Sequence, residues 1–296
     1  MTNRWKIFSY PMSSEQKVFE HVKSKLMEVE QGSIVVLPEY VAYTEENSRQ
    51  TLTALVDICR SKSISVITTL NLVPPNLPHA TKDVNYNVLT IVTKEGKVHT
   101  PQAKITPQSF ERVQYEPRFP KMNVGDYDYL NKVTIEIDGV KSSVFFVICS
   151  DVYCLMAGVE RKEELKADYC IVPGNFGNGA EKAVRRTLER FREAGLFKTT
   201  IFANPYQNLK DASQTPLVKE ATEMIELAPA HSIRELTDWD RIQLVKENVA
   251  IYPDDQVPSF VHMTNLTAMD EGRMTVGMSR FPVVVQLGSY SEVIQL

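Results

Sequence analysis

The segment Ser33-Ile34-Val35-Val36-Leu37-Pro38-Glu39 (residues 33–39) decides the fold class. Its apolar, mostly β-branched run predicts a buried strand, and Pro38 ends it. Upstream, apolar residues recur at helical spacing between about residue 14 and residue 30, and a second helix is predicted from about 46 to 61. A further buried strand is predicted over 64–69. Helices alternating with buried strands indicate an α/β layered fold.

Two hairpins modify this prediction. Residues 86–93 alternate like a strand, and the turn Lys94-Glu95-Gly96-Lys97 leads into a partner strand that begins at Val98. A second pair, 133–138 and 143–148, flanks Gly139. Antiparallel hairpins exclude a purely parallel sheet. A mixed sheet covered by helices on one face satisfies both patterns, and its other face then needs a partner sheet.

Composition excludes several classes of function. The chain has 296 residues and a net charge of −4, and no basic patch stands out, so we expect no nucleic-acid partner. The four cysteines and five histidines are not arranged at metal-ligand spacing, so we expect neither a metal nor another cofactor. The first residues are too polar for a signal peptide, and no apolar run approaches the roughly 20 residues of a membrane span. Together with free thiols, these features predict a cytoplasmic protein without a membrane anchor.

Three chemically capable residues follow separate predicted strands. Glu39 follows the run over 33–38, Lys104 follows the first hairpin, and Cys149 follows Val144-Phe145-Phe146-Val147-Ile148. Catalytic groups collect at strand ends in α/β folds, because the scaffold there is rigid and the loops are open.

The contexts of these residues resemble those of the nitrilase (carbon–nitrogen hydrolase) superfamily. The matching motifs are Leu37-Pro38-Glu39, Ala103-Lys104-Ile105 and Ile148-Cys149-Ser150-Asp151. Later segments that resemble the family, within a likeness covering about residues 5–206, are Ala167-Asp168, Ile171-Val172-Pro173, Asn175, Arg186 and Ala203-Asn204. The resemblance implies a four-layer-forming αββα sandwich of mixed sheets with helices on the outer faces. It also implies pairing across a two-fold interface, so we expect a homodimer or a larger homo-oligomer.

The resemblance also implies a mechanism. Cys149 would be the nucleophile, Glu39 the general base, and Lys104 the cation that stabilises the tetrahedral intermediate, with the Ser150 backbone N–H as a second donor. The family's second glutamate would be Glu111, with Glu116 as the competitor.

We expect substrate contacts from Tyr115, Ser150, Asn175 and Phe176. The predicted function is hydrolysis of a non-peptide C–N bond in a small molecule, an amide or carbamoyl group rather than a nitrile. Two alternatives stay open: a non-catalytic ligand- or partner-binding protein on the same fold, and an acyltransferase that uses the same thioester.

The chain departs from the family pattern after its middle. The family's Pro-Glu after the cysteine is absent from Ser150-Asp151-Val152-Tyr153-Cys154, and the sequence matches poorly from about residue 208 onward. There we predict helices over 221–227 and 232–247 and strands over 249–252 and 281–287. No linker divides the chain, so a single domain over residues 1–296 is expected.

Overall fold

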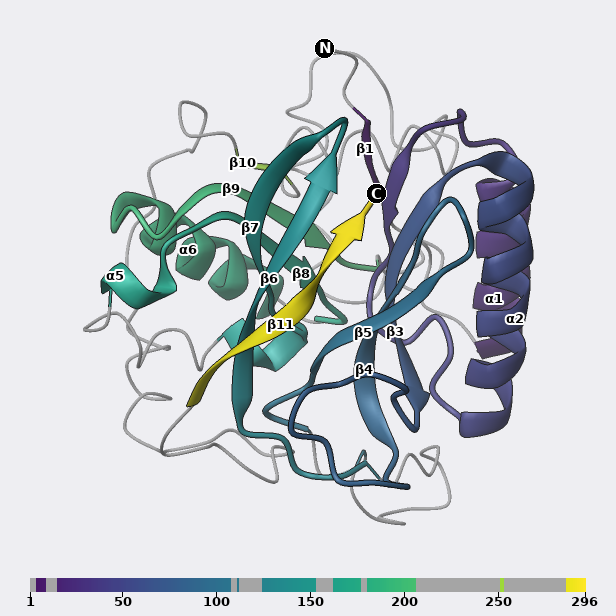
Figure 1. Cartoon of the computed structure of the whole chain (residues 1–296), viewed down its shortest axis with the longest axis horizontal. Helices are drawn as coiled ribbons and strands as arrows, with labels where there is room; N and C mark the ends of the chain where they lie inside the picture. Colours follow the sequence, from purple (N-terminus) through teal and green to yellow (C-terminus); the bar gives the residue numbers. More distant parts are fainter. Residues whose placement is uncertain are drawn as a thin grey trace, which may run out of the picture.

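The protein forms two mixed β-sheets that pack face to face, with helices on the outer side of each sheet (Figure 1). The computed structural model describes residues 4–8, 15–107, 111, 124–152, 162–176, 180–205, 251–252 and 286–296. The layers therefore run helix, sheet, sheet, helix, which confirms the predicted αββα arrangement.

The first sheet has the order β1-β2-β3-β4-β5. Strands β1 (Trp5–Ile7), β2 (Ile34–Val36) and β3 (Ser65–Leu72) are parallel, and β4 (Tyr86–Val92) and β5 (Val98–Ala103) continue antiparallel. Helices α1 (Glu15–Leu26) and α2 (Glu45–Lys62) cover its outer face (Figure 1). Helix α2 begins after Thr44, whose hydroxyl accepts a hydrogen bond from the Asn47 N–H, as an N-cap does.

The second sheet has the order β10-β9-β8-β7-β6-β11. Its strands are β6 (Tyr129–Ile137), β7 (Val140–Phe146), β8 (Ala167–Pro173), β9 (Phe197–Ala203), β10 (Ile251–Tyr252) and β11 (Gln286–Gln295). The short helix α5 (Lys162–Leu165) and helix α6 (Ala180–Glu193) lie on its outer side (Figure 1). The β6–β7 pair is the predicted second hairpin.

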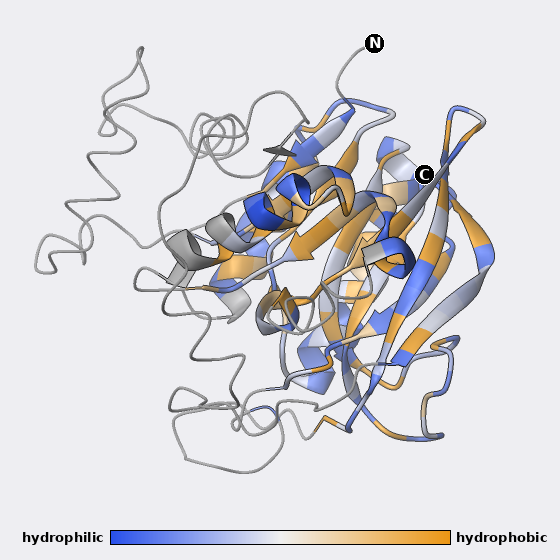
Figure 2. Cartoon of the chain, turned by 90° about the vertical axis from the view of Figure 1, so that its left-hand side faces the viewer, coloured by the Kyte–Doolittle hydropathy of each residue, from blue (hydrophilic) through white to orange (hydrophobic). Residues whose placement is uncertain are grey.

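Two apolar clusters explain why β2 is hydrophobic without interruption and why every residue of β3 is buried. One cluster fills the space between the sheets and includes Ile67, Ile91 and Phe146. The other joins the first sheet to α1 and α2 and includes Val35 and Leu55. Figure 2 shows apolar residues along the strands inside the layers and polar residues on the outer turns of the helices. A strand buried on both faces has no polar side to alternate with.

The C-terminal strand differs from its prediction. The pattern predicted a strand over 281–287, whereas β11 runs from Gln286 to Gln295. Beyond residue 287 the strand carries Ser289, Ser291 and Glu292, which are exposed, so the apolar run that marks a buried strand is missing there. Parallel pairing with β6 supplies the hydrogen bonds instead. The predicted helices over 221–227 and 232–247 lie outside the described residues.

Candidate active site

The three candidate residues meet where the ends of the two sheets face each other. Glu39 follows β2 and Lys104 follows β5 in the first sheet, whereas Cys149 follows β7 in the second. All three are buried, with exposed fractions of 0% for Glu39, 2% for Lys104 and 7% for Cys149. The Glu39 N–H also donates across the sheets to the carbonyl oxygen of Gly174, at 3.0 Å. The sandwich thus brings into one site groups that lie far apart in the sequence.

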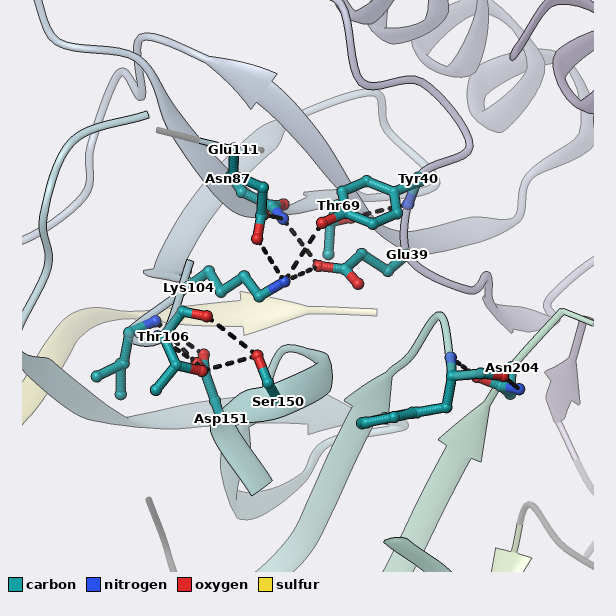
Figure 3. A network of polar contacts seen from close by, with 12 residues as sticks. Glu39, Tyr40, Thr69, Asn87, Lys104, Thr106, Glu111, Ser150, Asp151 and Asn204 are labelled. Atoms are coloured by element: carbon teal, nitrogen blue, oxygen red, sulfur yellow. Dashed lines mark hydrogen bonds and ion pairs between the residues drawn. The ribbon is translucent and has the colours of Figure 1, made fainter. Parts of the chain in front are cut away.

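The Lys104 ammonium lies between two buried carboxylates (Figure 3). Its Nζ is 2.8 Å from Glu39 Oε1 and 2.9 Å from Glu111 Oε2. Asn87, on β4, donates from Nδ2 to Glu39 Oε1 at 2.8 Å and to Glu111 Oε1 at 2.7 Å. These contacts fix the orientation of both carboxylates relative to the ammonium.

Charge pairing sets the protonation of this cluster. Burial alone disfavours the Lys104 ammonium, but the Glu111 and Glu39 carboxylates outweigh it and raise the pKa of Lys104 well above its usual value. Burial raises the pKa of Glu39, and Lys104 opposes that shift. Lys104 therefore stays charged, and Glu39 is a stronger base than an exposed carboxylate.

Cys149 begins a short 3₁₀ turn, η1 (Cys149–Asp151), with a backbone φ of 49°. A positive φ is uncommon for residues other than glycine and is found where surrounding structure enforces it, often at functional sites. The thiol is hydrogen-bonded to Glu39 and to the backbone N–H of Asn175. Burial and the nearby Glu39 carboxylate raise the pKa of the thiol well above 9.0, although Lys104 opposes the shift. The resting group is a neutral thiol with a base beside it.

Polar contacts hold the loop that carries Asn175. Asn204, just after β9, accepts from the Phe176 N–H at 2.7 Å and donates from Nδ2 to the Phe176 carbonyl oxygen at 2.9 Å (Figure 3). The Phe176 ring is buried, with its centroid 6.0 Å from that of Phe202. Asn175 thus lies at the thiol through its backbone, and Phe176 lies next to it in the apolar core. Their contacts with a substrate stay predictions.

Other predicted residues fall in different places. Glu111 contacts Lys104, whereas its competitor Glu116 and the predicted pocket residue Tyr115 lie outside the described residues. Ser150 is buried next to Cys149, and its hydroxyl donates to the Thr106 carbonyl oxygen at 3.0 Å. The role of its backbone N–H as an oxyanion donor stays a prediction.

Two residues of the cluster carried no predicted role. Asn87 is an amide inside a buried and mostly apolar strand, and that mismatch is a signal that the sequence offers. Tyr40 has a φ of 65°, and its hydroxyl lies 3.3 Å from Lys104 Nζ and hydrogen-bonds to Glu111. A tyrosine after a strand has no pattern that would single it out.

Within the described part of the chain, no group of three or more His, Cys, Asp or Glu side chains is arranged to hold a metal ion. In the same part of the chain, no helix is long and apolar enough to cross a membrane.

Comparison with known proteins gives structural matches alone. No protein-family model and no curated protein sequence matches the chain. Among solved structures, an amidase from Nesterenkonia sp. AN1 is 15% identical, with a TM-score of 0.46 over 68% of this chain and 75% of that chain. A protein from Xanthomonas campestris with an arsenic adduct in its active site is 14% identical, with a TM-score of 0.47 over 68% and 74% of the two chains.

These structural neighbours are nitrilase-superfamily proteins. The nitrilase superfamily is also the family that the sequence motifs resemble. The catalytic roles of individual residues stay predictions.

Proposed function

We propose that this protein hydrolyses a non-peptide C–N bond, an amide or carbamoyl group of a small molecule, through a thioester on Cys149. The observation that carries the proposal is the hydrogen bond between the Cys149 thiol and Glu39, whose Oε1 also accepts from Lys104 at 2.8 Å. A nucleophile next to a base, with a fixed cation in the same buried site, is what acyl transfer requires.

The steps follow from these positions. Glu39 takes the thiol proton while Sγ attacks the carbonyl carbon, and the C=O electron pair becomes an oxyanion. The Lys104 ammonium and a backbone N–H, with Ser150 as our candidate, stabilise that charge. The intermediate collapses with cleavage of the C–N bond, and the proton held by Glu39 leaves with the amine.

Water then releases the acid. Glu39 takes a proton from the water molecule that attacks the thioester carbon, and the departing thiolate is reprotonated. Glu111 and Asn87 keep Lys104 and Glu39 aligned through both half-reactions. This chemistry uses groups of this chain and water.

The first test measures whether Cys149 is an activated nucleophile. Iodoacetamide should alkylate Cys149 of the wild type, and Glu39→Gln should slow that reaction by about 100-fold, the lower end of the range for general base catalysis. The matched control is Glu45→Gln, a carboxylate on α2 that pairs with Arg49. Alkylation that proceeds equally in Glu39→Gln and wild type would contradict the proposal and favour a non-catalytic binding protein.

The second test identifies the reaction. Ammonia release is screened over small amides, ureas, carbamoyl amino acids and nitriles, with Cys149→Ala as the inactive control. Hydroxylamine added to the active mixture tests for the thioester, because it intercepts the acyl group as a hydroxamate. Release of the free acid in its absence indicates hydrolysis. Turnover that persists in Cys149→Ala would exclude the thioester.

A further inference from the structure

The reacting groups belong to different sheets, so something must fix their separation. Lys104 follows β5 of the first sheet, and Cys149 follows β7 of the second. Apolar packing between the sheets is not directional and sets a distance only loosely. A misplacement of about 1 Å at a reacting centre can cost about 100-fold in rate. Directional contacts between the two loops are therefore needed.

Asp151 supplies such contacts. It lies two residues after Cys149 and is 1% exposed. Its carboxylate accepts hydrogen bonds from the backbone N–H groups of the two residues that follow Lys104 (Figure 3). The distances are 2.9 Å to the Ile105 nitrogen and 2.7 Å to the Thr106 nitrogen. The Thr106 hydroxyl lies 2.8 Å from the same carboxylate. One side chain thus binds the loop of the cation to the turn of the nucleophile.

A second pair of groups reinforces this connection. The Thr106 hydroxyl also lies 2.8 Å from Ser150 Oγ, and the Ser150 hydroxyl donates to the Thr106 carbonyl oxygen. The cross-sheet hydrogen bond from Glu39 to Gly174 fixes the base but does not touch the Lys104 loop. The contacts of Ser150 and Asp151 with residues 105–106 join the Lys104 loop directly to the Cys149 turn.

We propose that Asp151 is a positioning residue that holds the Lys104 loop against the Cys149 turn and so sets the geometry for thioester formation. The proposal rests on the proposed function, because it concerns the reactivity of the same thiol. An asparagine at this position can still accept one hydrogen bond through its side-chain oxygen. Its NH2 group, however, would face a backbone N–H in the place where the second carboxylate oxygen of Asp151 accepts, so two donors would meet. Since an unsatisfied buried N–H is costly, the two loops should move apart in that variant.

The experiment compares Asp151, in the turn after β7, with a carboxylate on a strand of the second sheet. Asp151→Asn is the test variant. Asp168→Asn is the matched control, because Asp168 also accepts from a backbone N–H, that of Ser143 at 2.8 Å, but it lies at the start of β8, where its other partner is Lys198. For each variant the iodoacetamide rate at Cys149 is measured against pH, and thermal unfolding is recorded in parallel.

We expect Asp151→Asn to alkylate about 100-fold more slowly and to lose the dependence of labelling on Glu39. Asp168→Asn should label like the wild type even where its unfolding temperature falls by a similar amount. A wild-type rate in Asp151→Asn overturns the positioning role. By contrast, a wild-type protein whose labelling ignores Glu39 overturns the proposed function instead, so the two failures are distinguishable.

A milder pair of variants covers the case in which Asp151→Asn does not fold. Thr106→Val removes the hydroxyl that contacts Asp151 and Ser150 and keeps the backbone N–H, whereas Thr106→Ser keeps both groups. We expect slower alkylation in Thr106→Val and a wild-type rate in Thr106→Ser. Equal rates in both variants would overturn the proposal.

Discussion

At the scale of single residues, Lys104 concentrates the electrostatics of the site. Its ammonium is buried and contacts two carboxylates that are also buried. Two such carboxylates without a cation would repel each other in a medium that screens poorly. The residue that we propose to stabilise an oxyanion therefore also stabilises the folded protein.

We predict that Lys104→Met lowers the free energy of unfolding by about 3–5 kcal/mol, since it leaves buried charges uncompensated. Urea denaturation measures this change. The control is Lys198→Met, because the exposed Lys198 pairs with Asp168 and should contribute about 0–1 kcal/mol. Similar losses in both variants would contradict the assignment of Lys104 to a buried ion cluster.

The Cys149 thiol gives a second prediction at this scale. Burial and the Glu39 carboxylate raise its pKa above the ordinary 9.0, so the sulfur keeps its proton at neutral pH and becomes an anion in alkaline solution. The thiolate ultraviolet absorbance, taken as wild type minus Cys149→Ala, should be absent at neutral pH and still absent at about pH 9, where an ordinary thiol is about half ionised. A thiolate signal at neutral pH would instead indicate a preformed ion pair.

At the scale of elements, the site depends on loops at the ends of β2, β5, β7 and β8. Each loop is held by a polar side chain or backbone group of another segment, as Asn204 holds the residues after β8. Asp151 does the same for the loops after β5 and β7, and burial raises its pKa from 3.8 to about 7. The folded protein therefore binds this proton more tightly than the unfolded chain does.

This shift predicts a pH dependence with a definite sign. Between about pH 4 and pH 7 the folded state holds more protons at Asp151 than the unfolded state, so stability falls as pH rises through that window and levels off above it. Asp151→Asn has no such proton. The unfolding free energy of the wild type relative to Asp151→Asn should fall by up to about 4 kcal/mol from pH 4 to pH 7. Urea titrations across the window would contradict the shift if the difference stayed constant.

At the scale of the whole molecule, two sheets with outer helices form one sandwich, and the C-terminal strand joins both sheets. Strand β11 pairs with β6 of the second sheet, while Tyr290 OH lies 3.0 Å from His99 Nδ1 of the first. Glu292 forms an ion pair with Lys97 of the first sheet at 3.0 Å. The C-terminal strand thus connects the two sheets through side-chain contacts, and Figure 1 shows it alongside β6.

Assembly is the prediction that belongs to this scale. The family resemblance implies pairing of two sandwiches across a two-fold axis, so we expect a homodimer or larger. Sedimentation equilibrium at micromolar concentration should give at least twice the 33.6 kDa of the chain. A mass of one chain under those conditions would contradict the expected pairing.

Much of the fold could be predicted because buried strands and helices have apolar patterns that can be recognised within a few neighbouring residues. Strand β2 has no polar face, α2 repeats apolar residues at helical spacing, and Gly96 marks a turn with a φ of 77°. Glu39, Lys104 and Cys149 could be selected for the same reason, since each follows a recognisable strand and motif. The second half of β11 has no apolar run and was therefore underestimated.

The sequence by itself determined the α/β layers and the three candidate residues that follow β2, β5 and β7. The tertiary structure alone decided which polar groups meet there: Asn87 between two carboxylates, Tyr40 beside Lys104, and Asp151 across the sheets. The physical reason is how far apart in the sequence the interacting residues lie. Hydrophobic periodicity is written in neighbouring residues, whereas a hydrogen bond between Thr106 and Asp151 exists only after two sheets have packed and brought separate loops within 3 Å of each other.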